Sequence, residues 1–315
     1  MKRFLHSVWG IVVCALLSLF IPTQTSAQEG FKEAGFTLAP SNFLGDLGGN
    51  FGRGTTFLKD NNFEMTKIMF GGHLSIYPKD WIGLRIAANV GKLEGDDAVI
   101  DDKGGLETGR KYRNLNFRSR LIEAFAAAEF YPTVFLEYDP TDVFHKIRPY
   151  GLIGVGVFNF NPQGLDAATG QWVNLKELHT EGQGFKEYPD RPEYKLTQLN
   201  IPMGVGIKYW ASDNVSIGLE VIHRKTFTDY IDDVSTAYID PQLFYNNLPL
   251  DKAVLAQRMA DKSPNGNTQT QIGGKRGTPQ NNDSYYSFGF KIGIRLGAGS
   301  DRGYRNSTRC PVIRF

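Results

Sequence analysis

The sequence lacks most of the features that mark enzymes and nucleic-acid-binding proteins. Its 35 basic and 33 acidic residues nearly cancel, and a net charge of +2 argues against a nucleic-acid partner. The five histidines include no pair at the spacing of metal ligands on a helix, so metal catalysis has no support. Beyond the N-terminal segment no run of about 18 apolar residues occurs, which excludes further transmembrane helices.

The N-terminus has the three parts of a secretory signal peptide. A positively charged start is followed by an apolar run from Val8 to Phe20 and by the small residues Thr25-Ser26-Ala27. We therefore expect residues 1–27 to be a signal peptide and Gln28 to lie near the mature start. A single anchoring helix is the alternative, for which the apolar run is short.

The segment from Tyr286 to Leu296 alternates strictly between two kinds of side chain. Large apolar residues stand at every second position, and the residues between them are small or charged. Because successive side chains of a strand point to opposite faces, this pattern predicts a strand with one apolar face and one small or ionic face.

Similar alternation predicts eight strands in all. It is clear in the third, sixth and seventh, whereas the apolar side of the fourth is rich in alanine and the faces of the fifth are mixed. The predicted strands span residues 35–43, 65–77, 81–91, 116–131, 148–160, 196–210, 214–227 and 285–296.

These strands fit either a membrane barrel or a soluble barrel or sandwich, such as a lipocalin-like domain, in which the apolar face would point inward. Connections that alternate between short turns and long polar loops favour the membrane, as do the glycines on the presumed inner face. Aromatic residues near the strand ends are also typical of an interfacial girdle. These are Tyr77, Trp81, Tyr131, Tyr209 and Trp210.

We therefore predict an all-β fold, an eight-stranded antiparallel transmembrane β-barrel over residues 28–296 with long extracellular loops. It would sit in outer-membrane lipid, with both termini in the periplasm and residues 297–315 as a periplasmic tail. The long loops are predicted at 45–62, 91–115, 161–195 and 228–284.

In this arrangement several charged residues face the interior of the barrel, and His73 joins them. Eight strands leave an interior just wide enough for side chains to fill, so buried charges there should pair. We expect a closed, ion-paired plug; a proton or ion path is the alternative. The predicted network consists of Arg85, Glu123, Glu129, Lys208, Glu220, Arg224, Lys291 and Arg295.

Candidate chemistry elsewhere is sparse. Asp229, Asp232 and Asp233 follow the seventh strand and could hold Ca²⁺, although their spacing is not that of an EF-hand and a solvated rim or hydrogen-bond cluster is favoured. His223 and Asp229 lie near the barrel rim, where a hydrolase would need them. Because many other polar residues also lie near the rim, this position alone does not indicate a hydrolase. We expect neither a cofactor nor enzymatic activity.

Cysteine is scarce, and Cys310 is alone outside the expected signal peptide. It stands in a polar, basic segment beyond the last predicted strand. An unpaired thiol in an oxidising compartment suggests an intermolecular bond or a reactive group. We expect Cys310 to form a disulfide with a periplasmic partner, with a buried structural thiol as the alternative.

Several sequence blocks resemble one family. They are Ser41–Gly49, Gly154–Pro162, Thr180–Gly184, Pro202–Lys208, Arg224–Ser235 and the Cys310-Pro311 end, of which Arg224–Ser235 is the most specific. Together they resemble PorG-type outer-membrane proteins of the Bacteroidota type IX secretion system.

The resemblance implies a non-enzymatic structural barrel that attaches a periplasmic secretion ring, built from a lipoprotein and its partner subunit, to the outer membrane. The alternative is a small outer-membrane barrel that binds a surface ligand or glycan through its loops, above all through loop 228–284.

Overall fold

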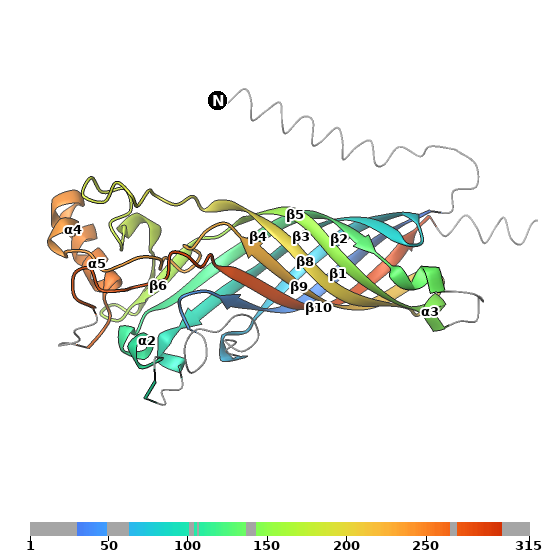
Figure 1. Cartoon of the computed structure of the whole chain (residues 1–315), viewed down its shortest axis with the longest axis horizontal. Helices are drawn as coiled ribbons and strands as arrows, with labels where there is room; N and C mark the ends of the chain where they lie inside the picture. Colours follow the sequence, from blue (N-terminus) through green and yellow to red (C-terminus); the bar gives the residue numbers. More distant parts are fainter. Residues whose placement is uncertain are drawn as a thin grey trace, which may run out of the picture.

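A computed structural model describes residues 30–48, 63–100, 104–105, 107–136, 143–264 and 270–297. Eight long strands form a closed antiparallel barrel (Figure 1), in the order β3-β2-β1-β10-β9-β8-β5-β4, and pairing between β3 and β4 closes the ring. The strands are β1 (Phe31–Leu44), β2 (Lys67–Lys79), β3 (Ile82–Asp96), β4 (Asn116–Phe130), β5 (Ile147–Asn159), β8 (Thr197–Trp210), β9 (Val215–Thr226) and β10 (Ser284–Leu296).

The predicted fold class is confirmed, and each predicted strand is present with bounds within a few residues. The largest difference is in β3, which continues to Asp96 and pairs there with Asn116. Its alternation persists because Leu93 points inward and is buried, while Glu94 pairs with Lys67 of β2. Among the residues that the structure describes, no helix has the length and apolar character needed to cross a bilayer.

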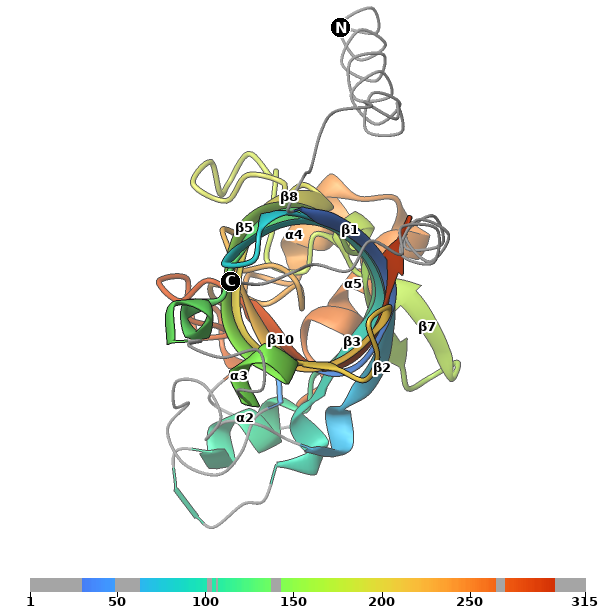
Figure 2. The same cartoon turned by 90° about the vertical axis from the view of Figure 1, so that its right-hand side faces the viewer.

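The two ends of the barrel are built differently. At one end, which we call the turn end, β2 joins β3 and β8 joins β9 through short turns, and β1 begins and β10 ends. The third connection at this end is longer and contains the 3₁₀ helix η4 (Pro132–Leu136) and the helix α3 (Val143–Lys146). Figure 2 looks along the barrel from the turn end and shows the closed ring of strands.

At the opposite end the long connections form a folded layer, which we call the cap. It contains the hairpin β6 (Pro162–Asp166) and β7 (Gln171–Asn174) and the helices α4 (Gln242–Asn247) and α5 (Leu250–Ala260). Shorter helices add to it: η2 (Phe63–Met65), η3 (Asp97–Val99), α2 (Glu107–Arg113) and η5 (Lys176–Leu178).

The cap has an apolar core of its own, in which α5 contributes one face. Its Ala253, Ala256 and Met259 are buried against Phe244 of α4 and Leu178 of η5. The segments predicted as long polar loops therefore include packed helices and a hairpin. The β6–β7 hairpin also extends the sheet, because β6 pairs with β4 just beyond the end of the β4–β5 ladder.

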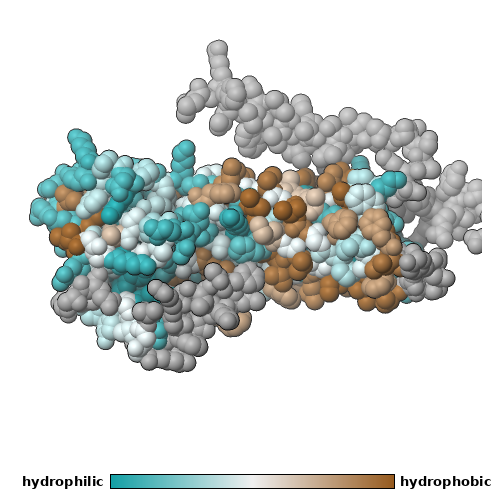
Figure 3. All heavy atoms as spheres, viewed as in Figure 1, coloured by the Kyte–Doolittle hydropathy of each residue, from teal (hydrophilic) through white to brown (hydrophobic). Residues whose placement is uncertain are grey.

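Apolar side chains cover the outside of the barrel. Ile153, Val155 and Val205 are 61%, 69% and 66% exposed, and Figure 3 shows the barrel surface as mainly hydrophobic beside a mainly hydrophilic cap. Of the predicted aromatic girdle, Trp81 and Tyr209 are exposed on this surface.

The girdle prediction was wrong for Tyr77 and Tyr131, which are buried. Tyr77 shares the inward face of β2 with His73, four residues earlier, and both phenol hydroxyls donate to Glu129. Trp210 packs instead against Phe31 and the guanidinium of Arg295 at the turn end.

Candidate functional site

The interior of the barrel holds three groups of charged side chains. Side chains of a strand alternate between its two faces, and each of these charges stands at a position that faces the interior of the barrel. We describe the groups from the middle of the barrel, then toward the turn end, then toward the cap.

The central group joins β3, β4, β9 and β10. The Arg85 guanidinium contacts Glu129, and its Nη1 donates to Glu220 Oε2 at 2.8 Å. Lys291 Nζ lies 3.4 Å from Glu220 Oε2 and 4.0 Å from Glu129 Oε1. The Tyr150 hydroxyl also donates to Glu220 at 2.7 Å, so that carboxylate accepts from both a cation and a phenol.

The second group lies toward the turn end, around Glu33 of β1. Lys208 Nζ of β8 is 3.0 Å from Glu33 Oε1, and the Ser216 hydroxyl donates to Oε2 at 2.9 Å. Lys208 also donates to the Tyr77 hydroxyl, which links this group to Glu129. His73 Nε2 lies 3.6 Å from the same Glu33 carboxylate.

The third group lies toward the cap, around Glu123 of β4. Arg224 Nε approaches Glu123 Oε1 at 3.3 Å, and the side-chain amides of Asn89 and Asn200 donate to the carboxylate at 2.7 and 2.8 Å. The Tyr285 hydroxyl donates to it at 3.0 Å. Beyond this group, apolar side chains close the cap end of the interior: Phe43, Phe117, Phe158, Phe160 and Ile231.

Seven of the eight residues assigned to the network from the sequence are buried in these groups. The eighth, Arg295, lies at the turn end, where it is partly exposed and stacks on Phe31 and Trp210. Sequence reasoning missed Glu33, which is 1% exposed, because the first strand was predicted to begin at residue 35. Extending the alternation of Gly35 and Thr37 backward by two residues would have placed Glu33 inside.

With Glu33 included, the charges in the three groups balance. Glu33, Glu123, Glu129 and Glu220 face Arg85, Lys208, Arg224 and Lys291, four carboxylates and four cations. A cavity between the groups, lined by His73, Arg85, Asn89, Glu220 and Arg224 among others, is about the size of one water molecule. Among the described residues, side chains of the three groups pack the middle of the barrel around this small cavity.

The three aspartates that follow β9 divide between two sites beneath the cap. Asp233 is fully buried and accepts from the hydroxyls of Thr180 and Tyr194, at 2.5 and 2.7 Å, beside Arg276. Asp232, also fully buried, accepts the backbone N–H groups of Leu47 and Val234, both at 3.0 Å.

Asp232 belongs to a group of four carboxylates with Asp46, Asp229 and Asp283, which we call the aspartate cluster. Asp283 is fully buried and accepts from the Ile231 backbone N–H at 2.8 Å, and Asp229 is 6% exposed. The structure thus shows a buried cluster and not a solvated rim. Within the described part of the chain, no three His, Cys, Asp or Glu side chains are grouped to hold a metal ion.

Burial raises the pKa of these carboxyl groups, and their mutual repulsion raises it further. The pKa of Asp229 rises to about 8, while those of Asp232 and Asp283 rise well above the usual range. At the separate site of Asp233, burial raises the pKa to about 6 against the opposing charge of Arg276. The guanidinium of Arg113 opposes the shift at Asp232, but it is already paired with Asp97. The aspartate cluster therefore holds protons at neutral pH.

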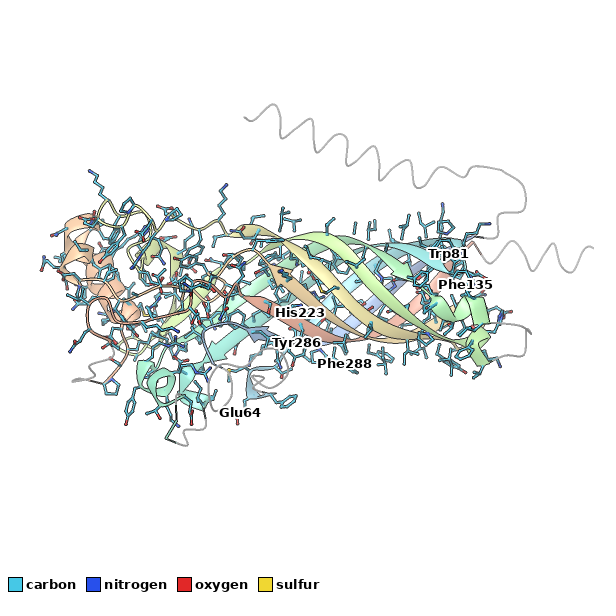
Figure 4. All side chains as sticks on the ribbon, in the orientation of Figure 1. Glu64, Trp81, Phe135, His223, Tyr286 and Phe288 are labelled. Atoms are coloured by element: carbon cyan, nitrogen blue, oxygen red, sulfur yellow. The ribbon has the colours of Figure 1, made fainter. Side chains whose placement is uncertain are left out.

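His223 and Asp229, the residues that a rim hydrolase would need, face different surroundings. His223 lies on the outward face of β9, opposite Tyr286 of β10 (Figure 4), whereas Asp229 is buried beneath the cap. Cys310 and the expected signal peptide at 1–27 lie outside the described residues, as does the predicted tail beyond Gly297.

A protein-family model matches residues 11–247, which is most of the chain and includes every barrel strand except β10. Its description is "Domain of unknown function (DUF6089)". The chain belongs to the DUF6089 family. None of the curated proteins matches this member of the family at a significant level.

Several solved structures are similar to this chain at low identity. The attachment invasion locus protein Ail of Yersinia pestis is 10% identical, with 85% of this chain and 99% of that chain covered and a TM-score of 0.37. The outer membrane protein OprG from Pseudomonas aeruginosa is 11% identical, with 87% and 98% covered and a TM-score of 0.34. Likeness at this level carries no functional inference, and the barrel assignment rests on the strand pairing itself.

We predict that Glu129→Gln lowers the free energy of unfolding by about 3–5 kcal/mol, because it leaves the two buried cations Arg85 and Lys291 with Glu220 as their one shared carboxylate. Urea unfolding of the refolded barrel, followed by gel mobility, measures the change. The matched control is Glu177→Gln, which breaks the exposed pair with Lys252 and should cost less than about 1 kcal/mol. Equal losses in the two variants would contradict a stabilising interior network.

We predict that the cap is most stable at acidic pH. The folded pKa of Asp229, about 8, exceeds the unfolded value of about 3.9. The folded state therefore binds more protons, and this stabilisation is complete below pH 4 and is lost as the pH rises toward 8. Hydrogen exchange of residues 227–239 should accelerate, beyond the intrinsic effect of pH, between pH 5 and 9.

Asp229→Asn should weaken this pH dependence, since the amide does not titrate whereas Asp232 and Asp283 still do. Asp190→Asn, at an exposed position of the cap, should leave it unchanged. A cap whose protection does not depend on pH, or which becomes better protected as pH rises, would show that the aspartates are ionised in the folded state.

Proposed function

We propose that this barrel spans the bacterial outer membrane. The supporting observation is the distribution of side chains: ionised groups are paired inside the barrel, and large apolar side chains such as Val155 and Val205 stand on its outside. In a soluble barrel the apolar face would form the core. If this barrel stood in water, its apolar outer surface would be exposed to solvent, whereas in a bilayer the acyl chains would cover that surface.

The orientation follows from the connections. Outer-membrane barrels have short turns on the periplasmic side and long loops outside the cell. The turn end would therefore face the periplasm and the cap would face outward. Both ends of the barrel chain, Phe31 and Leu296, lie at the turn end, which agrees with export by the expected signal peptide and with periplasmic termini.

Within the membrane, we propose a structural and non-enzymatic role in protein secretion of the type IX kind. The packed interior supports it, because a barrel filled by paired charges is an anchor and not a pore. The resemblance to PorG-type proteins supplies the partners: a periplasmic ring built from a lipoprotein and its partner subunit. No cofactor is required for this role.

The most specific part of that resemblance, Arg224–Ser235, lies where β9 enters the cap. Arg224 pairs with Glu123 in the interior, and Asp232 and Asp233 bond the cap to the barrel rim. These contacts give the block a structural role: it ties the cap to the barrel. The contact with the ring would then come from the turn end and from the tail that carries Cys310.

The folded cap supports a second candidate, a surface receptor for a ligand or glycan. A cap with its own apolar core presents a defined surface outside the cell, as a receptor would need. Removing α4 and α5 (residues 242–260) together distinguishes the two functions. Lost binding of cells to a glycan array with normal secretion favours the receptor, and the reverse favours the secretion component.

We predict that Val155→Arg destabilises the barrel in a bilayer by about 2–4 kcal/mol, because Val155 lies near the middle of β5 and faces outward. Reversible unfolding in lipid vesicles measures it. Replacing an exposed residue of the cap, as in Asp251→Arg, should change stability by about 0.5 kcal/mol or less. A Val155→Arg protein as stable as the cap control would indicate that water, and not lipid, surrounds β5.

We predict that deleting residues 297–315 leaves the barrel inserted but releases the periplasmic ring. Heat-modifiable gel mobility of outer-membrane fractions reports the barrel, and co-purification of the ring subunits reports attachment. Cys310→Ser should remove a thiol-sensitive adduct from nonreducing gels of native membranes. A deletion variant that fails to insert would make the tail part of the assembly signal, and an adduct that survives Cys310→Ser would exclude the disulfide.

A further inference from the structure

The connection between β4 and β5 differs from the other two turns of the turn end. It exposes four large apolar side chains within two short helical segments: Phe135 and Leu136 in η4 are 61% and 52% exposed, and Val143 and Phe144 in α3 are 61% and 36% exposed. A surface connection in water would be expected to be polar. Contiguous exposed apolar groups of this kind mark a surface that another phase or molecule covers.

This patch is continuous with the outer surface of the barrel. The Phe135 ring lies 6.0 Å from the Trp81 ring and 6.3 Å from the Phe130 ring, and Trp81 and Phe130 are 6.1 Å apart. Figure 4 shows Trp81 and Phe135 close together at the turn end. Phe130 is the last outward residue of β4, so the apolar belt of the strands passes without a break into η4.

The same connection carries charges of both signs: Glu137, Asp139 and Asp142 stand between η4 and α3 in the sequence, and a lysine follows the apolar side chains of α3. Lys146 ends α3 and is exposed, and it follows Phe144 by two residues. Aromatic and aliphatic side chains beside a lysine form the pattern that lies flat at a membrane surface, with the ring systems at headgroup depth and the ammonium near phosphate. Continuity with the apolar belt of the strands favours lipid over a protein as the covering surface.

We propose that η4 and α3 form an interfacial anchor that lies in the headgroup region of the inner leaflet of the outer membrane. Phe135, Leu136, Val143 and Phe144 enter the boundary of the acyl chains. This inference rests on the proposed membrane location of the barrel. It assigns the longest turn-end connection to the lipid surface, which leaves the tail as the element that reaches into the periplasm.

Single cysteines carrying an environment-sensitive fluorophore test the anchor. We would place them at Val143 in the anchor, at Val155 in the belt and at Asp251 in the cap, in the full chain with Cys14→Ser and Cys310→Ser. Each labelled barrel is refolded into phosphatidylcholine and phosphatidylglycerol vesicles that contain lipid with a nitroxide either near the headgroup or deep in the acyl chain. We expect the shallow nitroxide to quench position 143 at least twofold more than the deep one, the reverse at 155, and neither to quench 251.

The controls separate failure of the anchor from failure of the membrane location. Absence of quenching at 155 would overturn the membrane location itself. Quenching at 155 without quenching at 143 would overturn the anchor alone, whether water or protein surrounds the probe. A label at Leu136 repeats the measurement in η4, so that a local disturbance of α3 by the label at 143 does not decide the result. Protection of 143 from a water-soluble thiol reagent only in native membranes, and not in vesicles, would mean that a protein partner covers this surface and would also overturn the proposal.

Discussion

Pairing of ionised groups inside a narrow barrel is the constraint on which the structure depends. A charge in this interior is removed from bulk water, so it is stable only with a partner of opposite sign at short range. Glu33, Glu123, Glu129 and Glu220 meet this need for four cations, and phenols and amides satisfy further lone pairs. The inward face of each strand is therefore fixed, and the outward face is left to apolar side chains.

The same constraint explains what could be predicted from the sequence. Once a strand has one apolar and one ionic face, a shift of one residue would exchange the faces, so strand positions and the inward direction of Arg85 or Lys291 follow from alternation alone. The ion-pair partner of each inward charge does not follow from the alternation. Arg85 bonds Glu220, 135 residues away, and that pairing depends on the stagger of strands around the ring.

The cap was not predictable in the same way. Its helix α5 presents Ala253, Ala256 and Ala260 to the core, small residues that give little apolar periodicity, and their partners lie in segments far away in the sequence. The aspartate cluster was seen only in part. Asp229 and Asp232 lie close in sequence, but Asp46 follows the end of β1 and Asp283 directly precedes β10. Only the closed barrel brings the four together.

The interior network has a consequence for how the barrel forms. Lys208 and Glu33 are 175 residues apart, and Lys291 of the last strand lies beside Glu129 of the fourth. These charges cannot be neutralised until β10 has arrived and the ring has closed. Partly assembled sheets would expose uncompensated charge, so closure is cooperative, and contacts between such distant segments make it slow. A nascent chain of this kind has to be kept from aggregation until its final strand is available.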